Sequence, residues 1–341
     1  MHRIVLARRP QGAPTPESFR LETLPLPQPG EGEVLVRVTS LSLDPYMRGR
    51  MDDAKSYAPK VELGEVMTGG GVGTVVESRA EGFAPGDVVF GMTGWADHAV
   101  LRGKELRKLR EGLPASTALG VLGMPGFTGW YGLTIPGAAK AGETVVVAAA
   151  TGPVGSMVGQ IAKAKGLRAV GIAGGREKCA MGRDVFGFDA MIDHKAHTDA
   201  RSLREELAAA CPDGVDIYFE NVGGMVLEAV LPLMNTHGRI PLCGTIAWYG
   251  GADTSGPDRL PKLWRQILVN RLSITGFIIF DHWQHFPDFM AEVAPMVEEG
   301  RLAYVEDVAE GLEAMPQTFI SMLKGGNLGK QIVRLAPDPF G

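Results

Sequence analysis

The stretch T-V-V-V-A-A-A-T-G-P-V-G, residues 144–155, decides the fold of this 341-residue chain. Residues 144–149 form a run of β-branched and small apolar residues that predicts a buried strand, and residues 156–165 predict a helix after it. The turn between them departs from the G-x-G-x-x-G pattern, because alanine replaces the first glycine. Gly152 still lets the backbone approach a pyrophosphate, and Gly155 lets the helix pack close to the strand. The stretch therefore predicts a dinucleotide-binding turn; the alternative is a tight strand–helix turn without a ligand.

The alternation of strand and helix continues on the C-terminal side of this turn. Apolar runs predict further strands at residues 168–173, 190–193, 215–220, 238–242 and 273–280. Helices are expected between them at residues 176–186, 200–210 and 226–233. Strands that alternate with helices at such short spacings indicate an α/β fold with a parallel, doubly wound sheet of the Rossmann type.

The N-terminal part of the chain is of a different kind. About 110 residues are β-rich, with β-branched runs separated by turn signals such as P-G and G-G-G. Strands are expected at residues 33–40, 72–78 and 87–90, and six prolines between residues 10 and 29 predict edges and turns rather than helices. This pattern suits a small, irregular barrel or sandwich. Near the C-terminus we expect helices at residues 286–299 and 312–323 and a strand at residues 330–335, which returns to the first domain.

Composition restricts the class of protein. With 45% apolar and 21% charged residues the chain is globular, and its length suggests two domains of about 150 residues or more each. A net charge of −5 disfavours nucleic acid or an anionic membrane as partner. The three cysteines, at 179, 211 and 243, are odd in number and form no C-x-x-C motif, which favours a reducing compartment. No apolar run approaches about 18 residues, so we expect a cytoplasmic protein without a transmembrane helix.

The end of the second predicted strand indicates which nicotinamide cofactor binds. In NAD sites a carboxylate at this place holds the ribose 2′-hydroxyl. Here residues 171–175 read G-I-A-G-G and carry no acid, and Arg176 and Lys178 follow. Two cations beside a glycine turn suit a 2′-phosphate, so the sequence predicts NADPH. The alternative is that both are ordinary solvated charges at the start of a helix.

The sequence does not predict a metal site. Catalytic zinc needs three Cys, His or carboxylate ligands that converge in one place. All three cysteines lie beyond residue 178, so the N-terminal domain contributes none, and the pairs His194/His197 and His282/His285 have i,i+3 spacing but no third ligand with a convincing rationale. We therefore expect that a group other than a metal polarises the substrate.

Seven segments together carry a family resemblance. They are L-S-L-D-P-Y-M-R-G-R-M (41–51), G-M-P-G-F-T-G-W-Y-G-L (123–133), A-A-T-G-P-V-G-S-M-V-G-Q-I-A-K (149–163), G-I-A-G-G-R-E-K-C (171–179), Y-F-E-N-V-G-G (218–224), G-R-I-P-L-C-G (238–244) and G-N-L-G-K-Q (326–331). The chain resembles zinc-independent medium-chain dehydrogenase/reductases, in particular the NADPH-dependent alkenal/one double-bond reductases, which include prostaglandin and bacterial curcumin reductases. The resemblance implies a GroES-like substrate domain at residues 1–124 and 284–341, a Rossmann NADPH-binding domain at residues 125–283, and a homodimer.

The resemblance also implies which residues contact NADPH. Carried over by motif, they are Met124, Thr128, Gly152, Pro153, Val154, Gly155, Gly174, Lys178, His194, Asn221, Cys243, Gly244, Thr245, Ile246, Tyr249, Phe277, Ile278, Ile279 and Asn327. One departure concerns the 2′-phosphate: the family commonly has tyrosine in an I-D-Y-K segment, whereas this chain reads I-D-H-K with His194. Histidine donates to phosphate more strongly when it is protonated.

The reaction that the resemblance implies is hydride delivery from NADPH to the β-carbon of an α,β-unsaturated ketone or aldehyde. Negative charge then develops on the carbonyl oxygen, which needs a hydrogen-bond donor. The resemblance points to Tyr249 as that donor, and to Tyr46 as a second catalytic residue that lines the substrate pocket. The alternatives are that Tyr249 stacks in the wall of the site and that Tyr46 anchors its loop. Candidates for apolar walls of the pocket are Trp95, Trp248 and Trp283.

Two other classes of function remain open at this point. The same fold serves quinone reductases and zinc-free alcohol dehydrogenases, and the enone assignment rests on the Asp44-Pro45-Tyr46 segment and the Tyr249 loop. A non-catalytic NADPH-binding sensor is the third possibility. A panel of enones, quinones and alcohols separates them.

Overall fold

The computed structural model describes residues 1–250 and 259–340, which form two compact units. Among the described residues, the first unit takes 1–123, 249–250 and 306–340, and the second takes 124–248 and 259–305. No helix of the described residues is both long and apolar enough to cross a membrane.

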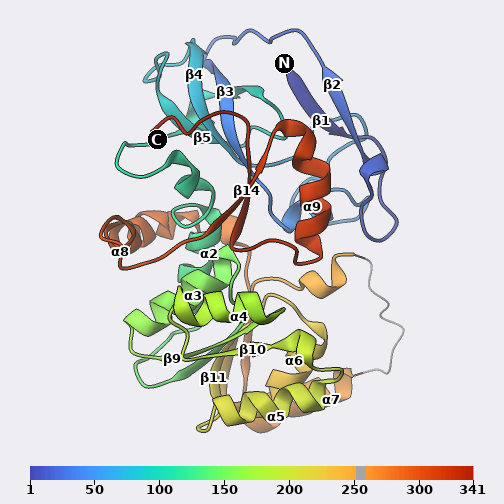
Figure 1. The fold of residues 1–341 in the computed structure, drawn as a ribbon, viewed down its shortest axis with the longest axis vertical. Helices are drawn as coiled ribbons and strands as arrows, with labels where there is room; N and C mark the ends of the chain where they lie inside the picture. Colours follow the sequence, from blue (N-terminus) through green and yellow to red (C-terminus); the bar gives the residue numbers. More distant parts are fainter. Residues whose placement is uncertain (251–258, 341) are drawn as a thin grey trace. The chain divides into compact units, whose positions relative to one another are not determined.

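The first unit is built on a seven-stranded sheet (Figure 1). Its strands are β3 (Glu33–Ser42), β4 (Gly71–Ser78), β5 (Val88–Gly91), β6 (His98–Arg102), β7 (Arg107–Lys108), β14 (Glu306–Glu310) and β15 (Lys330–Arg334). The long strand β3 pairs antiparallel with β4, β6 and β15. The C-terminal strand therefore returns to the first unit, as predicted. The proline-rich opening forms a separate antiparallel pair, β1 (His2–Leu6) with β2 (Phe19–Thr23).

The core of the first unit is aromatic. Trp95 is fully buried, and its ring stacks on Phe19 at 5.3 Å and meets the edge of Phe319 at 5.4 Å. Phe319 comes from helix α9 (Met315–Leu323), which follows β14. Trp95 is thus a core residue, and its interpretation as a pocket wall is wrong, since the two phenylalanines already cover it.

The second unit contains the predicted parallel sheet. Its strands are β8 (Thr144–Ala148), β9 (Arg168–Ala173), β10 (Ala190–Asp193), β11 (Val215–Phe219), β12 (Met234–Leu242) and β13 (Ser273–Gly276). They lie in the order β10-β9-β8-β11-β12-β13, and every pairing is parallel. If the six strands are numbered along the chain from β8 to β13, their order across the sheet is 3-2-1-4-5-6. The strand order reverses between β8 and β11, and ligands of such sheets bind at the carboxyl ends beside that point.

The helices of the second unit are α2 (Met124–Thr134), α3 (Pro153–Ala164), α4 (Arg176–Asp184), α5 (Ala200–Ala210), α6 (Gly224–Val230), α7 (Leu260–Asn270) and α8 (Phe286–Glu298). They cover both faces of this sheet, except α8, which packs on α2. Figure 1 shows α3 and α4 on one side and α5, α6 and α7 on the other. The predicted doubly wound α/β architecture is confirmed.

Three predicted elements fall three or four residues short of a predicted end. The strand predicted to reach residue 280 ends at Gly276, because Phe277 leaves the sheet and packs against Tyr131, with 5.5 Å between ring centres. The helix predicted to reach residue 233 ends at Val230, where Pro232 cannot continue the α-helical hydrogen bonds. The helix predicted from residue 312 begins at Met315, with Pro316 in its first turn.

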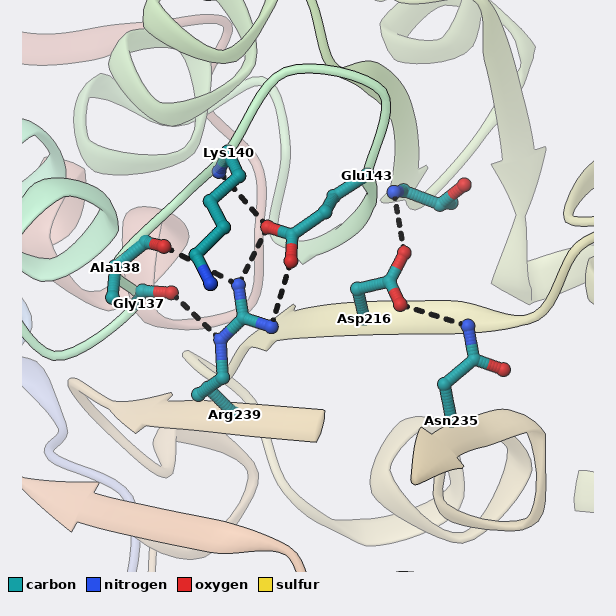
Figure 2. A network of polar contacts seen from close by, with 8 residues as sticks. Gly137, Ala138, Lys140, Glu143, Asp216, Asn235 and Arg239 are labelled. Carbon is teal, nitrogen blue, oxygen red and sulfur yellow. Dashed lines mark hydrogen bonds and ion pairs between the residues drawn. The ribbon is translucent and has the colours of Figure 1, made fainter. Parts of the chain in front are cut away.

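The amino ends of the parallel strands are joined by a polar network (Figure 2). Arg239 on β12 donates to both carboxylate oxygens of Glu143, at 2.9 and 2.6 Å, and to the carbonyl oxygen of Gly137 at 3.0 Å. Asp216 on β11 accepts from the backbone N–H of Thr144 at 2.9 Å and from the Asn235 side chain at 2.8 Å. These contacts tie β8, β11 and β12 together at the end of the sheet opposite the ligand-binding edge.

Candidate active site

The turn after β8 has the shape that a pyrophosphate needs. Gly152 precedes α3, Pro153 occupies its first turn, and no side chain caps this helix. A Cβ atom on Gly155 would lie 2.4 Å from the carbonyl oxygen of Ala149, so only glycine lets the helix approach the strand this closely. At Gly152 a Cβ atom would meet the same oxygen only at 3.5 Å, so the space before the helix is open. Backbone N–H groups at the start of a helix favour phosphate there, and the turn therefore fits the cofactor.

Helix α2 packs directly against this turn. A Cβ atom on Gly129 would lie 2.6 Å from the carbonyl oxygen of Val154, so the two backbones touch. Met124 and Thr128 are on the first turns of α2, and the Thr128 hydroxyl donates to the Met124 carbonyl oxygen at 2.7 Å. The structure thus places these two predicted cofactor residues on the helix that contacts the turn.

Asn221 spans the point where the strand order reverses. It follows β11, and its side-chain amide donates to the carbonyl oxygen of Ala148 at the end of β8, at 2.8 Å. The preceding residue, Glu220, is 1% exposed, and one of its carboxylate oxygens accepts the N–H groups of Val222 at 2.6 Å and Gly223 at 2.8 Å. Burial raises the pKa of Glu220, and these backbone N–H groups oppose that rise. Glu220 therefore shapes the loop that presents Asn221.

The loop after β12 is held by the loop after β11. Ile246 and Ala247 donate backbone hydrogen bonds to the carbonyl oxygens of Asn221 at 3.2 Å and Val222 at 3.0 Å. A Cβ atom on Gly223 would lie 2.8 Å from the Trp248 ring, so glycine is needed where the ring rests. Tyr249 follows this turn directly.

Glu220 and Gly223 are site residues that sequence reasoning misses, although they belong to one of the family motifs. The motif carries a signal: an acid directly after a buried strand, followed by two glycines. Gly223 and Gly224 both have positive φ angles, of 80° and 56°, which other residues rarely adopt.

Two further predicted cofactor segments lie at the same edge of the sheet. Cys243 and Gly244 donate backbone hydrogen bonds to the Glu220 carbonyl oxygen at 2.9 and 3.2 Å. Burial and the nearby Glu220 raise the pKa of the Cys243 thiol to about 12, so it stays protonated and is no nucleophile. After β13, Phe277 and Ile279 are buried, and Ile278 lies between them.

The ends of β9 and β10 gather the residues predicted for the 2′-phosphate. Ala173 and Asp193 are opposite each other in the parallel register, so Gly174 and His194 follow side by side. Lys178 is half-buried in the first turn of α4, whereas Arg176 is exposed. The carboxylate of Asp193 accepts the backbone N–H groups of Gly175 at 2.7 Å and Lys195 at 3.0 Å.

Tyr46 and Asn327 belong to the first unit. Burial and the nearby charge of Asp44 raise the pKa of Tyr46 well above its usual value, so its phenol stays neutral. Asp44 accepts a hydrogen bond from Ser42 and pairs with the buried Lys330 at 2.7 Å. The side-chain amide of Asn327 donates to the carbonyl oxygen of Gly329 at 2.8 Å, in the loop before β15.

The histidine pairs considered as metal candidates have other contacts. His197 pairs with Glu206 at 2.6 Å, and His282 stacks on Tyr131 with ring centres 4.5 Å apart. Within residues 1–250 and 259–340, no group of three or more His, Cys, Asp or Glu side chains lies close enough together to hold a metal ion.

Comparison with known proteins supports the fold and identifies the family. The chain matches the family descriptions "N-terminal domain of oxidoreductase" over residues 2–109 and "Zinc-binding dehydrogenase" over residues 153–295. It is 52% identical to the NADPH-dependent curcumin reductase of Escherichia coli over 339 residues, which is 98% of this chain and 97% of that protein. It is 41% identical to the NADP(+)-dependent 2-alkenal reductase of Nicotiana tabacum, covering 91% of this chain and 89% of that one.

A solved structure agrees over the full length. The crystal structure of CurA from Vibrio vulnificus in complex with NADPH has a TM-score of 0.94 and 50% identity, covering 99% of this chain and 100% of that chain. The predicted combination of a Rossmann domain with a β-rich N-terminal domain is therefore confirmed. This chain belongs to the medium-chain dehydrogenase/reductases, in the zinc-independent group of NADPH-dependent enone reductases.

Proposed function

We propose that this protein reduces the carbon–carbon double bond of α,β-unsaturated ketones and aldehydes with NADPH as the hydride donor. The carboxyl edge of the parallel sheet carries this proposal, because one edge gathers the open glycine turn at Gly152, the bridging amide of Asn221, and the cationic Lys178 with His194 beside it. The curcumin and 2-alkenal reductases that the chain is similar to support the same reaction.

NADPH, when bound, supplies the hydride that reaches the β-carbon of the substrate. The carbonyl oxygen becomes negatively charged as the hydride arrives, and a well-placed hydrogen-bond donor lowers the energy of that state. We assign this donor to Tyr249, which directly follows the turn held by Asn221 and Val222. Tyr46, kept neutral by burial and by Asp44, is assigned to the substrate pocket as a second donor. The remaining cofactor residues of the motifs, Asn327 among them, are proposed to contact NADPH.

The first test measures NADPH oxidation with a medium-chain 2-alkenal and with an aryl enone, beside NADH, a quinone and an alcohol, with and without a chelator. We expect rapid, NADPH-selective and chelator-insensitive reduction of the double bond. Chelator-sensitive oxidation of the alcohol, or turnover of the quinone alone, would contradict the proposal. Tight NADPH binding without turnover of any compound would instead identify a sensor.

We also propose that the protein acts in the cytoplasm and forms a homodimer. The three free cysteines suit a reducing compartment. For the dimer, the second unit offers an apolar surface: Trp264 and Leu268, one helical turn apart on α7, are 60% and 78% exposed. Strand β13 is an edge strand of the parallel sheet and is exposed along its length; Ile274 on it is 40% exposed. An exposed strand edge beside an apolar helix favours pairing with a second copy.

Leu268→Glu is expected to convert the dimer into a monomer, because it places two carboxylates in the apolar contact that the twofold symmetry creates. Light scattering coupled to gel filtration measures the mass. Val185→Glu is the matched control, since Val185 is 45% exposed at the end of α4 and lies outside this surface. A wild-type protein that is monomeric at micromolar concentration would refute the dimer.

A further inference from the structure

The edge formed by the ends of β9 and β10 has an unusual distribution of charge. The nearest carboxylate, that of Asp193, accepts the backbone N–H groups of Gly175 and Lys195 and so belongs to the turn itself. Lys178 and Lys195 add two positive charges. The two lysines therefore attract an anion to this edge of the sheet, and the Asp193 carboxylate is already hydrogen-bonded to the backbone.

His194 stands in the middle of this group. It is half-buried, and a Cβ atom on Gly174 would lie 2.9 Å from its Nε2 atom and 2.9 Å from Cε of Lys195. The imidazole therefore occupies the space over Gly174, at the end of the second strand of the Rossmann sheet. In this fold the ribose of the adenosine half of the cofactor, with its 2′-substituent, lies at that place.

The surroundings keep the imidazole neutral when no anion is present. Burial lowers the pKa of His194, and the positive charges of Lys195 and Lys178 lower it further, whereas Asp193 acts in the opposite direction. An unperturbed imidazole has a pKa of about 6.5, so at neutral pH His194 is mostly uncharged. A phosphate carrying about two negative charges at pH 7 reverses this balance, because it offsets the lysines and accepts a hydrogen bond from the charged ring.

We propose that His194 takes up one proton from solvent when the 2′-phosphate of NADPH binds, so that the preference for a 2′-phosphorylated cofactor grows as the pH falls. The proposal rests on the proposed use of NADPH and makes His194 a specificity-determining residue. The proton binds to a ring nitrogen, and no other bond changes. Binding raises the pKa of His194. The full contribution of His194 to the affinity for the 2′-phosphate is therefore present at pH values below the pKa that His194 has in the free protein. That contribution is lost as the pH rises through the higher pKa of the complex.

The experiment is calorimetric titration of 2′,5′-ADP and 5′-AMP between pH 6 and 8.5, in two buffers that differ in ionisation enthalpy. We compare the wild type with His194→Gln and His194→Tyr, neither of which titrates in this range. His197→Gln is the control, since it makes the same change at a histidine three residues along the chain, whose ring pairs with Glu206. The free 2′-phosphate titrates near pH 6, so proton uptake is compared between variants at pH 7, where most of the free phosphate is already a dianion.

We expect the wild type to take up more protons than His194→Gln on binding 2′,5′-ADP at pH 7, by a fraction of a proton up to one. Its affinity advantage over His194→Gln should be about 10-fold or more at pH 6, the scale of a charged hydrogen bond. That advantage should approach unity at pH 8.5. His194→Tyr should likewise show no uptake, His197→Gln should behave as wild type, and all variants should bind 5′-AMP alike, which shows that they are folded.

Two results would overturn the inference and can be told apart. If the wild type binds 2′,5′-ADP more tightly than 5′-AMP but takes up no more protons than His194→Gln, the proton linkage is wrong and the use of NADPH stands. If 2′,5′-ADP binds no better than 5′-AMP, the assignment of NADPH fails as well.

Discussion

Replacing Tyr249 with phenylalanine is expected to lower kcat for an α,β-unsaturated ketone by roughly 10²–10³-fold, the scale of losing one donor to a developing oxyanion. The substitution removes one hydroxyl and keeps the ring. The backbone bonds from Ile246 and Ala247 to the loop after β11, and the contact of Trp248 with Gly223, do not involve that hydroxyl. The turn should therefore stay in place, and the affinity for NADPH should change little.

Steady-state kinetics with an aryl enone at saturating NADPH measures the loss, and a fluorescence titration measures NADPH binding in parallel. Tyr304→Phe is the matched control: it makes the same chemical change in the segment between α8 and β14, and should keep kcat within about twofold. Near-normal turnover of Tyr249→Phe would remove Tyr249 from the mechanism and leave it as a wall of the site. A large loss of NADPH affinity would make it a cofactor residue instead.

Lys178→Ala is expected to weaken NADPH binding by about 1.5–3 kcal/mol, or roughly 10–150-fold, the range for a hydrogen bond to a charged group. NADH, which lacks the 2′-phosphate, should bind almost as before. The physical reason is the position of Lys178 in the first turn of α4, where its charge acts on His194 beside the glycine turn. Dissociation constants for both cofactors, measured at one salt concentration, give the comparison.

Lys140→Ala serves as the control for the loss of one positive charge. Lys140 is exposed and lies near Glu143 and Arg239 at the amino ends of the strands (Figure 2), the end of the sheet opposite the cofactor. Its removal should leave both dissociation constants unchanged. Equal losses for NADPH and NADH in Lys178→Ala would mean that this lysine supports the fold of the site and does not recognise the 2′-phosphate.

Much of the second unit follows from local patterns. Strands β9 and β10 and helix α5 have the predicted bounds, because apolar periodicity and an N-terminal cap act within a few residues. Asp199, for example, caps α5 by accepting the N–H groups of Arg201 and Ser202. The turn at residues 149–155 and the missing acid after β9 are equally local, so residue type and spacing suffice to indicate the class of cofactor.

Helix α2 shows what local patterns miss. The segment M-P-G-F-T-G-W-Y-G-L-T contains three glycines and a proline, residues of low helix propensity, and its sequence does not predict a helix. It is helical because it is buried: Gly129 touches Val154, and Gly132 lies under the rings of Phe219 and Phe277. Packing against residues distant in the sequence outweighs the propensity of each glycine.

The sequence alone determined the doubly wound sheet and the glycine turn, and it predicted the cations proposed for a 2′-phosphate, since residue type and short spacing encode each of them. Only the tertiary structure revealed that Trp248 rests on Gly223, and that His194 stands over Gly174. It also showed that Lys330 pairs with Asp44, two residues before Tyr46. These contacts join residues up to 286 positions apart. Because such pairs meet only after the strands have assembled, no pattern within a short window of sequence contains them.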